Sequence, residues 1–317
     1  MKKSLILFFI TLILAQSFSQ HVVAQEKYSE GLLWKVSKEG VHVGHVFGTI
    51  HINDERVTRI PKVVSDIFNE SKGYAIEAFP SSHLWNPYHG WQDIKSRMML
   101  PEGTTLEDVA GKELADNVQR IMTNNGVSAD YAQKIKPWAA MFSIATKSTH
   151  TGPIIDHKLL DIAKIQEKQL YQVESPEELL AAFYAMPMES QVSLLNDKVK
   201  TFPEMSRIMD KMILAYLKED LSGMMQASTE FIDKEPAKKA HYDAYIRHAI
   251  NIRNVVMAHY SLKPFRDAIH WLDYHKGKSA GAFVSIGALH LEGGKGILSL
   301  LENNYGFELE RIPVSFN

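Results

Sequence analysis

The sequence predicts an α/β protein with a mainly parallel central sheet, flanking helices and a large helical insertion in the middle of the chain. Three observations favour this class. β-rich segments open and close the mature chain, a strand–helix–strand order follows the first of them, and from about residue 100 to 275 apolar residues recur at helical spacing. We expect residues 25–317 to form a single domain that includes the insertion.

The first expected elements are a hairpin and a crossover unit. Residues 31–38 and 41–47 are rich in β-forming residues and flank a Glu-Gly pair, which is typical of a tight turn. Residues 60–71 have helical spacing with a proline near the start, and a β-run at 74–79 follows. Strands joined by such a crossover are parallel, so their carboxyl ends should meet at one edge of the sheet.

The middle of the chain is predicted to be mainly helical. A capping-box signal at residues 104–107 opens it, and the run 168–173 is typical of a third parallel strand. Ser175, Pro176 and Glu178 then form a strong helix start. Most of the 13 methionines follow, and we expect them to fill the core between helices. The closing strand, helix and strand are placed at residues 281–287, 296–304 and 306–312.

Composition excludes several classes of function. The chain has 317 residues, of which 45% are hydrophobic and 23% are charged, so it can bury a core. Its net charge of -2 offers no basic excess for a phosphate backbone, so we expect no nucleic-acid partner. It has 0 cysteines, which excludes disulfides, thiolate nucleophiles and iron–sulfur clusters. Any metal site must therefore use His, Asp and Glu.

The N-terminal segment is typical of a secretory signal peptide. Two lysines precede an apolar run at residues 5–15, which is shorter than the roughly 20 residues that span a bilayer. Cleavage is expected after Ala24, with Ser19 as the alternative, so residues 1–24 form the signal peptide. No later stretch is apolar enough to enter a membrane. The mature chain is expected to be exported, to the periplasm in preference to the cell exterior.

Two copies of a Gly-x-x-His motif stand at the ends of predicted strands, at residues 48–51 and 287–290. Ligands of open α/β sheets bind beyond the carboxyl ends of strands, so His51 and His290 should face one crevice. Glu77 lies in an otherwise apolar β-run, where a buried carboxylate needs a partner. A cation is the simplest partner. Spacing leaves alternatives open: the histidines could be structural, and Glu77 could pair with an arginine or cap a helix.

Other patterns are weaker candidates. The chain has no His-Glu-x-x-His motif and no Gly-x-Ser-x-Gly elbow, and the glycines at 293–296 lack Walker spacing. His42 and His45 are three apart on a predicted strand, so we expect them to face opposite sides. His241 and His248 are seven apart on a helix, about 10 Å, too far to share one metal.

The two terminal motifs, together with several internal segments, resemble the TraB/GumN family, to which the Tiki metalloproteases belong. The resemblance covers nearly the whole mature chain, and the pair of Gly-x-x-His motifs is its most specific part. The matching positions are residues 33–36, 46–51, Glu77, Asp156, Asp161, 172–178, 253–257, 285–291, Gly293 and Gly296.

The resemblance implies an α/β fold related to erythromycin esterases and haem-associated ChaN-like proteins, with a divalent metal between the two motifs. It implies that His51, Glu77 and His290 are the metal ligands and catalytic residues. Arg253 and Asn254 would then line the substrate site. Asp156 and Glu174 are expected in a supporting role, and a helix-capping role suits Glu174 equally well because a carboxylate is favoured at a helix start.

We therefore expect a metal-dependent hydrolase, most simply a peptidase acting on a peptide or protein substrate, that uses Mn, Co or Zn. Glu77 would serve as a ligand or as the general base. Two alternatives remain open at this point. One is a periplasmic haem- or metal-binding protein without turnover, and the other is a non-catalytic helper in envelope assembly.

Overall fold

A computed structural model describes residues 28–79, 96–144, 152–274 and 281–316. The predicted signal peptide at residues 1–24 lies outside these ranges. The described chain builds one six-stranded sheet in the order β4-β3-β5-β2-β1-β6. Its strands are β1 (Leu33–Lys38), β2 (Val41–Thr49), β3 (Gly73–Ile76), β4 (Gln169–Gln172), β5 (Ala282–Gly287) and β6 (Glu308–Ile312).

The sheet is mostly parallel but mixed, so the prediction of a mainly parallel sheet is confirmed in part. Strands β4, β3, β5 and β2 are parallel neighbours, whereas β1 is antiparallel to both β2 and β6. The reversal begins at the predicted turn, where Glu39 (φ 53°) and Gly40 (φ 75°) are both left-handed, as a two-residue hairpin turn requires. The α/β class is confirmed, and the parallel part is the half of the sheet that carries the site.

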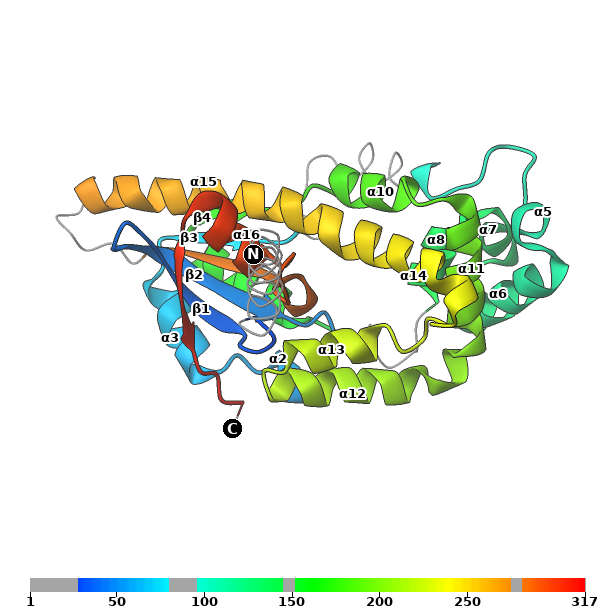
Figure 1. Cartoon of the computed structure of the whole chain (residues 1–317), viewed down its shortest axis with the longest axis horizontal. Helices are drawn as coiled ribbons and strands as arrows, with labels where there is room; N and C mark the ends of the chain where they lie inside the picture. The colour runs from blue at the N-terminus through cyan, green and yellow to red at the C-terminus, as the bar shows by residue number, and fades with distance from the viewer. Residues whose placement is uncertain (1–27, 80–95, 145–151, 275–280, 317) are drawn as a thin grey trace, which may run out of the picture.

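Helices lie around the sheet, on the left of Figure 1, and further helices form a second body on the right. Short helices precede β3, and the long segment between β4 and β5 is almost entirely helical. The helices are α2 (Glu55–Thr58), α3 (Lys62–Glu70), α5 (Leu106–Ala110), α6 (Lys112–Asn124), α7 (Ala129–Lys134), α8 (Pro137–Ser143), α9 (Ile155–Ile165), α10 (Pro176–Tyr184), α11 (Met188–Lys200), α12 (Met205–Leu217), α13 (Leu221–Ser228), α14 (Lys239–Tyr245), α15 (Ile252–Tyr274) and α16 (Ile297–Tyr305).

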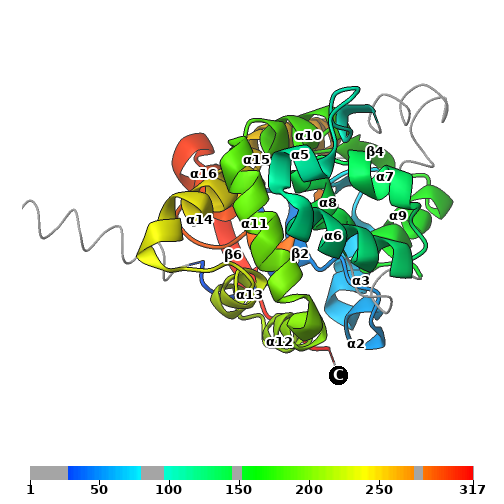
Figure 2. The same cartoon turned by 90° about the vertical axis from the view of Figure 1, so that its right-hand side faces the viewer.

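Two hydrophobic clusters hold the described chain together. The sheet cluster includes Phe47, Phe68 and Phe283, and the Phe283 ring contacts the rings of the other two. The helical cluster joins α5–α8, α10 and α11, and Trp138 stacks on Phe183 within it. Figure 2 looks onto this helical body, with α11 and α6 toward the viewer. Helix α15 connects the two parts, because it contacts β2, β3 and β5 as well as α10.

Local signals fixed several element ends. Ser175 caps α10, and Glu178 bonds back to the Ser175 amide, which confirms the predicted capping box. The earlier capping box is displaced by one residue, to Thr105 and Asp108.

Strand β3 ends at Ile76, so Glu77 follows the strand instead of lying inside it. Among the described helices, none combines the length and apolarity that crossing a bilayer requires.

Candidate functional site

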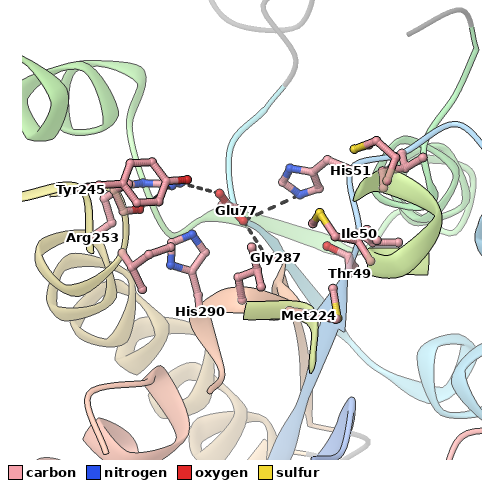
Figure 3. Close-up of a pocket in the computed structure, with 16 residues that line it drawn as sticks. Thr49, Ile50, His51, Glu77, Met224, Tyr245, Arg253, Gly287 and His290 are labelled. Atoms are coloured by element: carbon pink, nitrogen blue, oxygen red, sulfur yellow. Dashed lines mark hydrogen bonds and ion pairs between the residues drawn. The ribbon is translucent and has the colours of Figure 1, made fainter. Parts of the chain in front are cut away.

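The parallel half of the sheet brings both Gly-x-x-His motifs and Glu77 to one edge. Strand β5 lies between β2 and β3, with Gly287 paired to Thr49 and Ser285 paired to Ile76. Gly287 is the meeting point, because a Cβ atom added there would lie 3.1 Å from Glu77 Oε2, 3.5 Å from His290 Cδ2 and 3.9 Å from His51 Cε1 (Figure 3). Only glycine leaves this space free.

Glu77 is buried and held by two donors. Its Oε1 accepts from Arg253 Nη2 at 2.6 Å, and its Oε2 accepts from the Gly287 amide at 2.7 Å. Burial by itself raises the pKa of Glu77, but the charges of His51 and Arg253 and the Gly287 hydrogen bond outweigh it and hold the pKa well below its usual value. The sequence left the partner of Glu77 open, and in the structure that partner is the arginine Arg253.

Arg253 is shared between two carboxylates. Glu174, which follows β4 directly, accepts from Arg253 Nε at 2.8 Å and from Nη2 at 2.7 Å. Glu77 and Glu174 together carry one more negative charge than Arg253 neutralises. Glu174 therefore positions the guanidinium. The residue that caps the following helix is Ser175, so Glu174 is not its N-cap. Arg253 lines the pocket, but its donors are turned toward these carboxylates, and Figure 3 shows the contact with Glu77.

The tautomer of His290 is set by its neighbours. Asn254 Nδ2 donates to the Lys295 carbonyl at 2.8 Å, so the Asn254 Oδ1 atom faces His290 Nδ1 at 2.6 Å. An amide oxygen accepts, so Nδ1 carries the proton and Nε2 keeps its lone pair. Burial and the charge of Arg253 lower the pKa of His290 to about 3. Asn254 is almost completely buried and lies behind His290, not among the pocket-lining residues.

His51 lies between two carboxylates at the mouth of the site. Its Nε2 is 3.6 Å from Asp156 Oδ2 and 3.8 Å from Glu77 Oε2, and the side chain is 47% exposed. Partial burial lowers the pKa of His51, but Asp156 and Glu77 outweigh it and raise the pKa. Asp156 Oδ1 accepts from Thr49 at 2.9 Å, while Oδ2 is buried with no hydrogen-bond partner among the described residues.

A pocket of about 270 Å³ opens over this cluster. It includes side chains that the sequence did not single out, from α12, α13 and the helix that precedes Arg253. That helix begins as α14, passes through one π-helical turn at Ile246–Asn251 and continues as α15. Such turns are frequent at functional sites, and no sequence signal marks this one. The added lining residues are Ile50, Ile52, Met209, Met212, Met224, Tyr245, Ala249, Ile250, Ala288 and Leu289.

The predicted metal centre is not formed as a coordination site. Within the described ranges, no group of three or more His, Asp and Glu side chains is arranged to hold a metal ion. The donor chemistry of the cluster nevertheless suits a divalent cation. His290 offers a free Nε2 with its other nitrogen anchored, as ligating histidines do, and Asp156 offers an unpartnered buried oxygen.

The prediction for His42 and His45 was wrong. Their rings lie 4.8 Å apart on the same side of β2. Val36 pairs with Gly44 while the next residue, Ser37, pairs with His42, so β2 holds one extra residue at this point. A bulge of this kind shifts the alternation of side chains by one and brings residues three apart to one face. No third ligand-type side chain joins them within the described ranges.

Comparison with known proteins places the chain among relatives. The sequence profile described as the TraB/PrgY/gumN family matches residues 32–311. The protein YbaP of Shigella flexneri is 24% identical over 187 residues, which are 57% of this chain and 67% of that protein. YbaP of Escherichia coli (strain K12) is 24% identical over 178 residues, 55% of this chain and 63% of that protein. No solved structure matches the chain.

Proposed function

The chain belongs to the TraB/PrgY/gumN family, and we propose that it is an exported, metal-dependent hydrolase of peptide bonds with His51, Glu77 and His290 at its reacting centre. The observation that carries the proposal is the convergence of these three side chains on Gly287, below an open pocket. Residues that are distant in sequence meet there with shifted pKa values, which is typical of reacting sites. Export to the periplasm rests on the signal-like segment at residues 1–24.

A divalent cation such as Mn, Co or Zn would be held by His51, Glu77 and His290, with Asp156 oriented toward His51. Imidazole and carboxylate donors suit these metals, and the three parallel strands supply a rigid base for them. The chemistry that such a cation supplies is polarisation of a carbonyl oxygen and activation of water at neutral pH.

The side chains divide the remaining tasks by their protonation. Glu77 stays ionised and both its oxygens already accept hydrogen bonds, so it suits the role of ligand and electrostatic anchor better than that of proton-abstracting base. His290 is neutral with a free Nε2 and suits the role of ligand, because a pKa lowered to about 3 makes it a weak proton acceptor. Arg253 and Glu174 position Glu77, and Asn254 positions His290.

The alternative of a haem-binding protein is disfavoured by the volume of the pocket. About 270 Å³ lies below the range of ~300–1,000 Å³ that is usual for ligand pockets, and haem is larger than most of those ligands. A small metal-binding protein without turnover uses the same side chains, so it must be separated from the hydrolase by experiment.

The test uses purified mature protein, starting at residue 25. Metal content is measured by mass spectrometry, and a peptide library is then incubated with the protein with and without chelator. We expect bound divalent metal, cleavage that the chelator abolishes, and loss of both in His290→Ala. His42→Ala is the matched control, because His42 is a histidine outside the pocket. Metal binding without cleavage would identify a binding protein. The absence of both metal binding and cleavage would overturn the proposal.

A further inference from the structure

Methionines form one wall of the pocket. Met209 and Met212 are three residues apart on α12 and so share one face of that helix, and Met224 comes from α13, which packs against α12. Figure 3 shows Met224 and Ile50 on the His51 side of the cluster and Tyr245 on the Arg253 side. The polar cluster therefore lies between apolar walls.

This wall lies at the edge of the sheet core, because Met224 is buried within the sheet cluster and Met209 and Met212 pack against it. Ile213 and Tyr216 of α12 are buried in the sheet cluster, and Leu214 faces solvent with 52% of its surface exposed. Met209 and Met212 are half-buried, at the boundary where the pocket begins. An unbranched thioether adapts its shape to what it contacts, so methionines at such a boundary suit a binding wall for apolar groups of varied shape.

Desolvation favours the same class of group. An acidic or basic side chain of a substrate would lose part of its hydration against the methionines. A neutral apolar side chain does not meet this cost.

We infer that the pocket is a specificity subsite for an apolar, flexible side chain, of the size of leucine or methionine, on the residue next to the cleaved bond. The inference rests on the proposed peptidase function and deepens it by naming the substrate class. Hydrophobic subsites discriminate by about 10- to 200-fold for each methylene group gained or lost. We therefore expect kcat/KM to be at least about tenfold higher for leucine or methionine than for glycine at that position, and lowest for aspartate.

The first experiment profiles cleavage of a positional peptide library by wild type, Met212→Glu and Leu214→Glu. Met212→Glu adds a carboxylate to the wall and should shift the preference from apolar toward basic residues. Leu214→Glu puts the same charge on the solvent face of the same helix and should leave the profile unchanged. Met212→Leu keeps an apolar wall and should retain the wild-type preference. Cleavage by wild type without an apolar preference, or an unchanged profile in Met212→Glu, would overturn the inference.

The second experiment tests binding without turnover, so that the subsite and the peptidase can fail separately. Protein with ¹³C-methyl methionine is titrated with N-acetyl-leucine amide and with N-acetyl-aspartate amide, and the resonances of Met209, Met212 and Met224 are assigned from single Met→Leu variants. The leucine amide should shift these resonances and the aspartate amide should not. Shifts in a protein that cleaves no peptide would support the subsite and count against the peptidase. Equal shifts with both compounds, or none, would overturn the subsite.

Discussion

Replacing Glu77 by glutamine tests whether this carboxylate serves the fold, the chemistry or both. The substitution keeps the shape of the side chain and removes its charge. In the structure, Glu77 accepts from Arg253 Nη2 at 2.6 Å and from the Gly287 amide at 2.7 Å. A glutamine has one accepting oxygen, so one of the two donors would face an amide nitrogen instead.

The cost follows from these contacts. Removing one partner of a buried ion pair usually costs about 3–5 kcal/mol because a charge is stranded. Here Glu174 keeps its bonds to Arg253 at 2.8 Å and 2.7 Å, so the guanidinium retains a counter-charge. The substitution removes one charge-assisted hydrogen bond and leaves one buried donor without an acceptor. We therefore expect the free energy of unfolding to fall by about 2 kcal/mol.

Denaturant unfolding of wild type and Glu77→Gln measures this loss, with and without added Mn or Zn. Glu310→Gln is the control, because its ion pair with Lys35 is exposed and should contribute at most about 0.5 kcal/mol. A cation held by Glu77 would stabilise wild type further, so the difference should widen when metal is added. Equal losses in both conditions would assign Glu77 a structural role only. A metal-free loss below about 0.5 kcal/mol would refute the pairing argument.

Three further predictions concern export, metal retention and pH. Mass spectrometry of the periplasmic protein should find a start near Gln25 or Gln20, and an intact Met1 would contradict the signal peptide. His51→Ala and His290→Ala should each lose bound metal by at least about tenfold in affinity while their circular dichroism stays that of wild type, and parent-like binding would contradict a shared site. Because the folded-state pKa of His51 is raised, its contribution to apo-protein stability is present below the ordinary histidine pKa and is lost as pH rises through the raised value. The free energies of unfolding of wild type and His51→Gln should therefore differ more at pH 5.5 than at pH 9. The change should be about 0.5 kcal/mol or less, because the His51 ring is half exposed. A larger difference at pH 9 would contradict the sign of this effect.

Sequence patterns predicted the elements whose causes are local. Ser175 and Glu178 form their capping box within one turn, and the hairpin turn needs only two adjacent left-handed residues. The meeting of the two Gly-x-x-His motifs followed from a general rule about parallel strands, even though they lie more than two hundred residues apart. The site edge of the sheet was therefore predictable without knowledge of any long-range contact.

The remainder depends on contacts that no local signal encodes. Arg253 reaches Glu77 across 176 positions, after a π-helical turn that leaves no pattern in the sequence. The pairing of β6 with β1 added a second antiparallel contact beyond the predicted hairpin, and a single extra residue in β2 brought His42 and His45 together. In each case the decisive interaction is tertiary, so propensity and periodicity could not reveal it.

The charges of the site link its structural and chemical roles. Glu77, Glu174 and Asp156 are three buried carboxyl groups around one guanidinium, and burial raises the pKa of Glu174 and of Asp156, which disfavours the charged forms of both. His51 lies within 3.8 Å of two of these carboxylates, which raise its pKa, so a proton on its ring is stabilised by their charge. A divalent cation bound there would supply the same charge from nearly the same position, and it would require the unprotonated ring. Proton and cation should therefore compete for this edge of the sheet, so the carboxylates that demand a counter-charge in the apo protein also favour metal binding as pH rises.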